Sequence, residues 1–304
     1  MQLIGNGIGI PFQRKVGGGF VGLLDEYSGA AFAASVRLLR ADYAGGLLRA
    51  RANDGSTDQG EADVLPYDDG GSERFVSLDS RLINLDATAV TRGLTTSDTL
   101  GDLLDVGAGN YDGFIPTWYG QQAGSSINAV QTTASDQPKI ATAGALEVEN
   151  GKPALQFGSF AHLRTSSFAP LSVHSFFDVI FSSNDTQFIR DGISTSNRSA
   201  LYVITTTRYT RGIGQSYAYT NDLQSLYSTI VSGSNTDLAQ NGSSLESKDA
   251  GSETLTGINI GGFFDNSVLP FLGKYQEITL YPTNQSLNRI DIESNINNAF
   301  SIYP

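Results

Sequence analysis

Strand-length apolar runs dominate the chain beyond Gly124, and clusters of Asn, Asp, Gly and Ser separate them. Such clusters build turns, so the pattern predicts short strands joined by tight connections. The runs are PALQFGS, HSFFDVIFSS, ALYVITTT, GINIGGFF and KYQEITLYP. In VHSFFDVIF both faces carry apolar side chains, with Val173, Ser175, Phe177, Val179 and Phe181 on one face and His174, Phe176, Asp178 and Ile180 on the other. Mixed faces of this kind fit a strand inside a two-sheet sandwich.

The pattern differs near the N-terminus, where residues 30–42 are rich in helix formers. An apolar stripe recurs there with helical spacing and consists of Phe32, Val36 and Leu39, with Ala33 and Arg40 beside it. Ser28 is the predicted N-cap, and Gly45-Gly46 ends the predicted helix. Residues 47–53, LLRARAN, then alternate apolar and basic positions, which predicts a half-exposed strand.

Shorter patterns organise the remaining segments. Residues 54–71 are acidic and turn-rich and predict a loop. A short helix is expected next, with Ser97 as its cap, and its apolar face consists of Leu100, Leu103 and Leu104. A strand carrying Trp118, the sole tryptophan, follows. The chain closes with a predicted helix that has Ser286 as N-cap and an apolar side made of Leu287, Ile290 and Ile296.

Composition narrows the function classes. The 304 residues are 39% hydrophobic, 10% aromatic and only 16% charged, which suits a β-rich protein with many turns. A net charge of -12 argues against a nucleic-acid partner, because such affinity comes from Lys and Arg. The absence of cysteine excludes disulfides and thiolate metal sites, and His162 and His174 are too few for a multi-histidine zinc site. The sequence contains no run of about 18 apolar residues, so it predicts no membrane-spanning helix.

The first twenty residues, MQLIGNGIGIPFQRKVGGGF, combine apolar positions with glycines. A dinucleotide fingerprint requires a strand before its glycines and a helix after them, and neither fits here. The pattern instead predicts an anchoring arm, whose contact residues are Leu3, Ile4, Ile8, Ile10, Phe12 and Arg14. Three consecutive glycines then form a flexible joint. We therefore divide the chain into an arm and hinge, residues 1–19, and a sandwich, residues 20–304.

Three stretches together resemble a known group. They are residues 25–64, residues 112–157 with the motif WYGQQAG, and residues 258–300. The first two resemble the arabinofuranosidase B-like sandwich of fungal arabinofuranosidases and of phage and bacterial surface proteins, and the third resembles concanavalin A-like (LamG-type) jelly rolls. The resemblance implies a mainly β chain, a two-sheet antiparallel concanavalin A-like jelly-roll sandwich with a few short helices and an extended N-terminal arm. It also implies a carbohydrate-facing concave surface and a hydrolase ancestry. Gly120 and Ala123 stand where the family usually has Asp and Ser.

Hydrolysis of a glycoside requires two carboxyl groups about 5 to 9 Å apart. The candidates are Glu147, Glu149, Asp185, Asp191 and Glu277. Glu147 and Glu149 share a strand face, where such pairs are more often solvated and protect a sheet edge. Glu277 stands where the family commonly has a structural acidic residue. None of these positions matches the family's catalytic carboxylates, so we assign no catalytic residue and expect that the chain is not an enzyme.

Sugar binding without hydrolysis requires aromatic platforms beside planar polar groups. The stretch RYTRGIGQSYAYTND predicts an exposed hairpin or loop with the candidate glycan-binding residues Tyr217, Tyr219, Gln215 and Asn221. Trp118 and Tyr119 are a second platform, although core packing is the favoured interpretation of Trp118. The densest cluster of potential calcium ligands contains Asp54, Asp58 and Asp63. It lacks the ligand spacing of an EF-hand, and its composition is typical of a solvated loop. We therefore expect no cofactor and leave calcium open.

An apolar arm, a hinge and a lectin-like sandwich are typical of virion appendages. The sequence thus favours a structural bacteriophage protein in the virion, as a head fibre, capsid decoration or tail fibre component. Its expected partners are other virion proteins of the capsid or tail, bound through residues 1–16, further copies of itself, and a host surface glycan, with no nucleic acid and no membrane. The alternatives are an arabinofuranosidase-like glycoside hydrolase and a calcium-dependent bacterial surface lectin.

Overall fold

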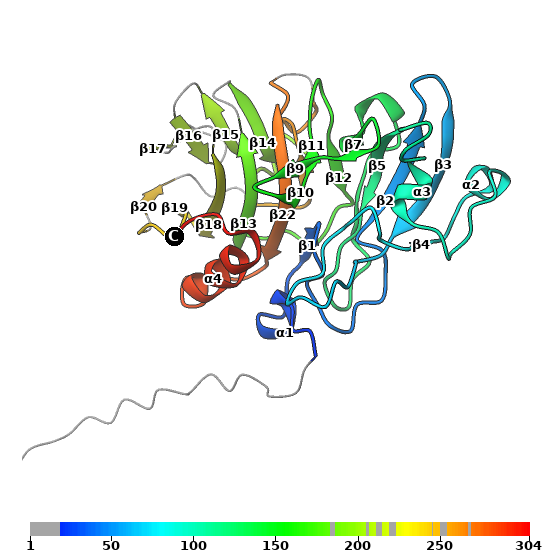
Figure 1. Cartoon of the computed structure of the whole chain (residues 1–304). Coiled ribbons are helices and arrows are strands. Elements are labelled where there is room, and N and C mark those ends of the chain that lie inside the picture. The colour runs from blue at the N-terminus through cyan, green and yellow to red at the C-terminus, as the bar shows by residue number, and fades with distance from the viewer. Residues whose placement is uncertain are drawn as a thin grey trace, which may run out of the picture.

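The computed structural model describes residues 19–182, 186–204, 207–210, 215–218, 223–244, 246–249, 254–266 and 269–304. These residues form a mainly β structure in which all the strand pairs are antiparallel, with a few short helices at its margins (Figure 1). The fold class predicted from the sequence is confirmed. The predicted anchoring arm, with Leu3, Ile4, Ile8, Ile10, Phe12 and Arg14, lies outside the described residues. No helix in the described part of the chain is long and apolar enough to cross a membrane.

Two sheets diverge from one shared strand, β5 (Asp112–Trp118). The start of β5 pairs with β7 (Lys139–Thr142), and its end pairs with β6 (Ala129–Val130). The first sheet continues from β7 through β11 (Leu155–Gln156), β22 (Gly273–Tyr281), β13 (Val173–Ser182), β18 (Gln224–Ser232), β19 (Asn235–Gln240) and β20 (Glu246–Asp249). The second continues from β6 through β12 (Leu163–Thr165), β21 (Asn259–Ile260), β14 (Gln187–Asp191), β15 (Leu201–Ile204), β16 (Thr207–Thr210) and β17 (Gln215–Ala218).

The remaining elements extend or cover this framework. On its other side, β5 pairs with β2 (Leu48–Asn53), which leads to β3 (Asp58–Val64) and β4 (Leu82–Ile83). The strand β1 (Phe32–Ser35) lies along β22. The short strands are β8 (Ala145–Leu146), β9 (Val148–Glu149) and β10 (Lys152–Pro153), and the helices are α1 (Leu23–Glu26), α2 (Ala87–Thr91), α3 (Leu100–Leu103), a 3-10 turn (Ala134–Asp136) and α4 (Arg289–Phe300).

An ion pair joins the two sheets through the interior. Arg190 of β14 donates from Nε to Asp178 of β13 at 2.9 Å, and both side chains are fully buried. The guanidinium also lies 3.6 Å from the ring centroid of Phe176, and Ser199 bonds His174 at 2.8 Å. The even-numbered face of β13 therefore points toward the second sheet. This arrangement confirms the two-face interpretation of residues 173–181.

The helix predicted for residues 30–42 is wrong. Its first residues form β1, which pairs with β22 and is buried at all four positions, Phe32–Ser35. A surface helix buries only one stripe, whereas a strand between two packed faces buries every side chain. The local helix is the shorter α1, ahead of the predicted cap Ser28. Tertiary pairing therefore overrides the helix propensity of this segment.

The neighbouring predictions have mixed outcomes. The strand predicted for residues 47–53 is confirmed as β2, but its predicted half-exposure is wrong, because four of its six residues are buried and the other two are partly buried. The loop predicted for residues 54–71 is wrong in part, because β3 (Asp58–Val64) pairs with β2 and leaves only a tight turn between them. The side chain of Asp54 accepts the backbone N–H groups of Ser56 and Thr57 and so closes this turn.

The two predicted later helices exist, with corrected ends. In α3 the leucines are buried as predicted, but Thr99 rather than Ser97 caps the helix. The terminal helix α4 begins at Arg289 rather than after Ser286. Its buried side consists of Ile292, Ile296, Ala299 and Phe300, whereas Leu287 and Ile290 are 96% and 66% exposed. The true apolar face follows the spacing i, i+4, i+7 and i+8, which the two exposed residues do not share.

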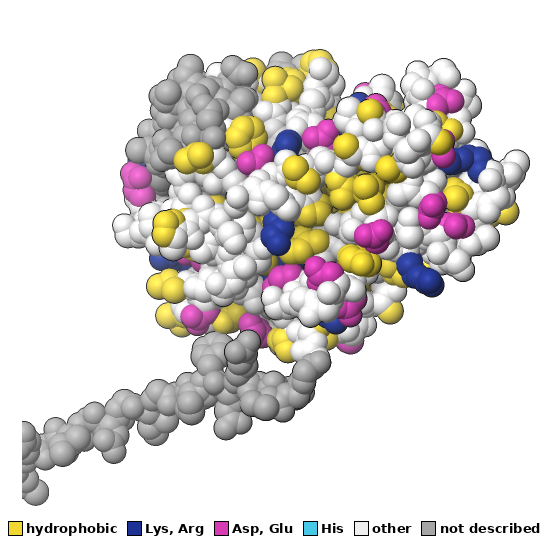
Figure 2. Space-filling model, in the orientation of Figure 1, with side chains coloured by type: hydrophobic (Ala, Val, Ile, Leu, Met, Phe, Trp, Pro, Cys, Tyr) yellow, Lys and Arg dark blue, Asp and Glu magenta, His cyan; other side chains and the backbone are white. Residues whose placement is uncertain are grey.

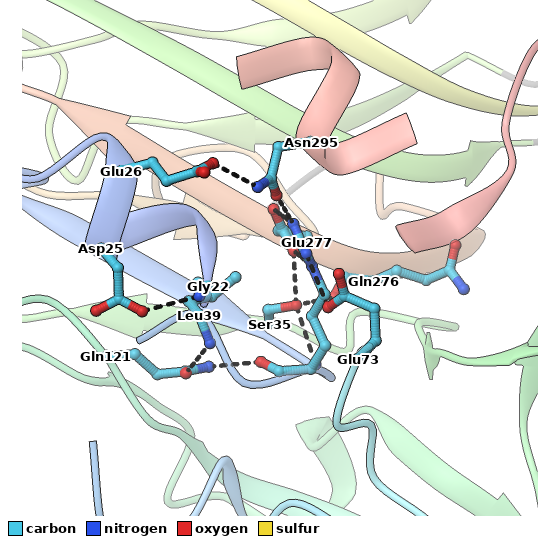
Figure 3. A network of polar contacts seen from close by, with 11 residues as sticks. Gly22, Asp25, Glu26, Ser35, Leu39, Glu73, Gln121, Gln276, Glu277 and Asn295 are labelled. Atoms are coloured by element: carbon cyan, nitrogen blue, oxygen red, sulfur yellow. Dashed lines mark hydrogen bonds and ion pairs between the residues drawn. The ribbon is translucent and has the colours of Figure 1, made fainter. Parts of the chain in front are cut away.

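A buried arginine connects four separate segments of the chain (Figure 3). Arg37, which follows β1, donates from Nε and Nη2 to Glu277 of β22 at 2.7 and 3.2 Å. Its Nη1 contacts Glu73 at 3.0 Å, and its Nη2 also contacts Asn295 of α4 at 3.1 Å. Arg37 and Glu277 are both fully buried, so each charge has its partner inside the protein. Glu277 therefore has a structural role.

We predict that Arg37→Met destabilises the protein by about 3 to 5 kcal/mol, because it leaves the Glu277 carboxylate buried without a cation. Urea unfolding followed by circular dichroism measures this loss. Adding Glu277→Leu should recover much of it, since the pair is then apolar. Arg74→Met is the control, because it breaks a partly exposed pair with Asp68, for which the expected cost is about 0 to 1 kcal/mol. Equal losses in both single variants would contradict the prediction.

The motif WYGQQAG is built into the core. Trp118 is fully buried, as the packing interpretation predicts. Gln121 accepts the Leu39 N–H at 2.8 Å and donates to the carbonyl of Arg37 at 2.9 Å. A Cβ on Gly120 would lie 2.1 Å from the carbonyl oxygen of Ile127. Glycine therefore stands at this position because the backbone leaves no room for a side chain.

We predict that Gly120→Ala lowers the free energy of unfolding by about 2 kcal/mol or more, because the methyl group forces the backbone near Ile127 to move. Thermal unfolding measures the change. Gly158→Ala is the matched control, since a Cβ there meets nothing within 4 Å. If Gly120→Ala is as stable as Gly158→Ala, the backbone near Ile127 moves without a loss of stability, which contradicts the prediction.

Candidate functional site

The predicted glycan-binding residues fall in the least described part of the chain. The strands β16 and β17 form the hairpin that the sequence predicts. Gln215 and Tyr217 belong to β17, of which the structure describes only the backbone, and Tyr219 and Asn221 lie outside the described residues. Glycan binding by these four residues stays a prediction.

The three carboxylates of the calcium candidate have separate partners. Asp54 closes its own turn, and Asp58 pairs with Arg51. Asp63 contacts Arg49 at 2.8 Å and Tyr119 at 2.7 Å. In the described ranges no group of three or more His, Asp or Glu side chains is placed to hold a metal ion. The structure therefore does not bring Asp54, Asp58 and Asp63 together.

Most of the carboxylates proposed for hydrolysis also have structural partners. Glu147 and Glu149 lie on either side of the Lys274 ammonium, with Nζ 3.9 and 3.8 Å from their oxygens. Burial raises the pKa of Glu149, and the charge of Lys274 opposes that rise. Glu277 is in the buried pair with Arg37, and Asp185 lies outside the described residues. Asp191 has the most distinctive surroundings of the set.

Asp191 ends β14 and is only 1% exposed. Arg198 donates to it from Nη2 at 2.7 Å and from Nε at 3.1 Å to each oxygen, and the Gly192 N–H donates at 2.8 Å. A further hydrogen bond comes from the Phe264 N–H. Burial raises the pKa of Asp191 because desolvation of the charged carboxylate outweighs the stabilising contacts with Arg198 and the backbone.

The Phe264 N–H belongs to a turn that carries a second carboxylate. After β21, the chain turns over residues 263–266, and the Asn266 N–H bonds the Phe263 carbonyl at 2.9 Å. Asp265 stands at the corner of this turn and is exposed. Because Asp191 contacts the preceding residue, the turn brings Asp265 to the same edge of the second sheet. Sequence reasoning missed Asp265, although the turn residues DNS, directly after the predicted strand GINIGGFF, mark it.

Aromatic rings surround Arg198 at this edge. Its guanidinium lies 4.7 Å from the ring centroid of Phe263 and 5.5 Å from that of Phe264. Phe188 contacts Phe263 at 4.8 Å between centroids and stacks on Tyr202 at 4.7 Å. Phe263, Phe264 and Tyr202 are partly exposed. We name Asp191, Arg198, Phe263, Phe264 and Asp265 the carboxylate corner; its Asp191 is the last residue of β14.

The carboxylate corner combines the groups that sugar recognition uses. Partly exposed rings offer faces for the C–H side of a sugar ring, and carboxylates and a guanidinium bond hydroxyl groups. A carboxyl group whose pKa burial raises, beside an exposed carboxylate, is also a pairing that acid–base chemistry uses. Acidic and basic side chains are interspersed over the face shown in Figure 2, so charge alone does not mark a site on that face.

Comparison with known proteins bears on the fold. No family model and no curated protein sequence matches the chain. Solved structures of arabinofuranosidases match it over 90% of its length. A mutant of GH54 α-L-arabinofuranosidase soaked with 4-nitrophenyl α-L-arabinofuranoside has a TM-score of 0.59 at 13% identity. An arabinofuranosidase complexed with arabinofuranosyl-α-1,2-xylobiose has a TM-score of 0.56 at 14% identity. The chain spans 63% of the length of each of these proteins.

This likeness corrects one expectation. From the sequence we expect that the chain is not an enzyme, and the comparison contradicts this expectation, because these structures, similar over 90% of the chain, are glycoside hydrolases. At 13 to 14% identity the likeness shows a shared fold. The chain thus has the jelly-roll-like sandwich fold of arabinofuranosidases.

Proposed function

We propose that the chain is a glycoside hydrolase of the arabinofuranosidase type and that the carboxylate corner is its sugar site. One observation carries the proposal: the buried Asp191, with its raised pKa, contacts the turn that presents the exposed Asp265 beside partly exposed aromatic rings. The likeness in fold to arabinofuranosidases supports the reaction class.

The two carboxyl groups suit different roles. Asp265 is exposed and therefore contacts the sugar, as the nucleophile or as the base that activates water. Asp191 holds its proton to a higher pH than an ordinary aspartate because it is buried, which suits a proton donor to the leaving oxygen. Phe263 and Phe264 orient the sugar, and Arg198 keeps Asp191 in place through its bonds to both oxygens.

The virion role stays a prediction. It depends on residues 1–16, which lie outside the described residues. A calcium-dependent lectin likewise has no observation in its favour, because the loop carboxylates have separate partners. The hydrolase is therefore the proposed function.

We predict that the protein releases 4-nitrophenol from 4-nitrophenyl α-L-arabinofuranoside. Asp265→Asn and Asp191→Asn should each lower kcat/KM by about 10²- to 10⁴-fold, the usual contribution of a positioned acid or base. The matched control is Asp79→Asn, an exposed aspartate with no part in the corner, which should keep wild-type activity. Circular dichroism establishes that all three variants fold.

The pH dependence of hydrolysis tests the role of Asp191 independently. If Asp191 donates a proton, activity falls as the pH rises through its raised pKa, and Asp191→Asn removes that limb of the profile. A folded wild-type protein that hydrolyses neither this substrate nor arabinose-substituted xylooligosaccharides at any pH would overturn the proposed function. Retained activity in Asp265→Asn would overturn the assignment of the site.

A further inference from the structure

A buried asparagine holds the turn that presents Asp265. Asn259 lies on β21 and is fully buried. Its Nδ2 donates to the carbonyl of Phe263 at 2.5 Å and to Oδ1 of Asn266 at 2.6 Å. These two acceptors lie on either side of Asp265 in the sequence. The Asn259 amide therefore connects the two ends of the turn.

Asp191 holds the other polar atom of the same peptide group. The Phe263 carbonyl and the Phe264 N–H belong to one peptide unit, and Asn259 bonds the former while Asp191 accepts the latter. Asp191 and Asn259 are register partners on the neighbouring strands β14 and β21. Two side chains that face each other across a sheet thus hold one peptide plane, which joins Phe263 to Phe264 in the turn that carries Asp265.

The side-chain oxygen of Asn259 takes no part in holding the turn. In the part of the chain that the structure describes, Asn259 Oδ1 is buried and makes no hydrogen bond. Leaving a buried acceptor unpaired is destabilising, so an amide is a poor choice for stability alone. Its two donors are what the position requires, and both of them point at the turn.

The two glycines before the turn allow Asn259 to form these hydrogen bonds. Gly261 has a φ of +92°, and a Cβ there would lie 2.4 Å from the Phe157 ring. A Cβ on Gly262 would lie 2.5 Å from Oδ1 of Asn266, one of the two acceptors of Asn259. The stretch NIGGFFDN therefore lets its own asparagine reach forward over the glycines to the turn.

We infer that Asn259 is a positioning residue that fixes Asp265 for the sugar, together with Asp191, and this inference rests on the proposed function. Asn259 touches no substrate itself. It acts by restraining the turn at the Phe263–Phe264 peptide and at Asn266, so that the Asp265 carboxylate keeps one orientation in the free protein and loses little entropy when the sugar binds.

The test replaces Asn259 by an apolar residue of similar shape. Asn259→Leu removes both donors and the unpaired acceptor, so its cost in global stability should be small. Amide hydrogen exchange of Asn266 in the free protein should accelerate about tenfold or more, because the turn opens more often. Exchange at Phe177, in the middle of β13, should stay unchanged. The kcat for 4-nitrophenyl α-L-arabinofuranoside should fall about 10- to 100-fold with little change in KM.

A matched variant separates the two contacts of the amide. Asn266→Gly keeps the left-handed backbone at this position, where φ is +58°, and removes only the Oδ1 acceptor. We expect its exchange at residue 266 to accelerate and its kcat to fall in the same directions as in Asn259→Leu but by less, because the bond to the Phe263 carbonyl persists. If Asn259→Leu does not fold, Asn259→Ser, which keeps one shorter donor, takes its place with the same expected directions.

The outcomes are separable from those of the proposed function. Unchanged exchange at Asn266 in a folded Asn259→Leu protein would overturn the inference, as would faster exchange with an unchanged kcat. A wild-type protein without hydrolase activity would overturn the proposed function and with it the catalytic role of Asn259. In that case the exchange rates would still decide whether Asn259 restrains the turn.

Discussion

The buried pair between Arg37 and Glu277 is the constraint on which the arrangement of the chain depends. Glu277 lies on β22, between β13 and β1, where an unpaired carboxylate would be very costly. Its cation must come from a segment that can lie along β22, so the chain before Arg37 is extended as β1. The same guanidinium then holds Glu73 and Asn295. One charge on a central strand thus determines where the N-terminal segment, a loop and the last helix pack.

This constraint also explains where the sequence is a good guide and where it fails. Long apolar runs such as residues 173–181 indicate their strands, because period and burial agree there. Residues 30–42 have the composition of a helix, but the position of Arg37 opposite Glu277, 240 residues away, decides their structure. No local pattern carries that information. Gly120 is a second example. A glycine is required there because a Cβ would meet the carbonyl oxygen of Ile127, which the folded backbone brings close.

The candidate site was predictable only in part for the same reason. Asp191 is among the candidate carboxylates that the sequence offers, although no predicted strand covers β14, which it ends. Its burial and its pairing with Arg198 depend on the packing of two strands and a turn. Asp265 gives a weaker signal, since DN after glycines is an ordinary turn sequence. This turn differs from an ordinary one in its hydrogen bonds to the side chains of Asn259 and Asp191. Those bonds form only when β14 and β21 pair.

The interior and the candidate site are linked through two consecutive residues of β14. Side chains alternate across a strand, so Arg190 and Asp191 point to opposite sides. Arg190 is fixed inside the sandwich by Asp178 and lies on the ring of Phe176. A slip of β14 by one residue would place the Asp191 carboxylate against Asp178 and turn Arg190 away from its partner. Like charges in a buried space repel strongly, so this register is excluded. The interior ion pair therefore orients Asp191 toward Arg198, and a structural contact sets the geometry of the site.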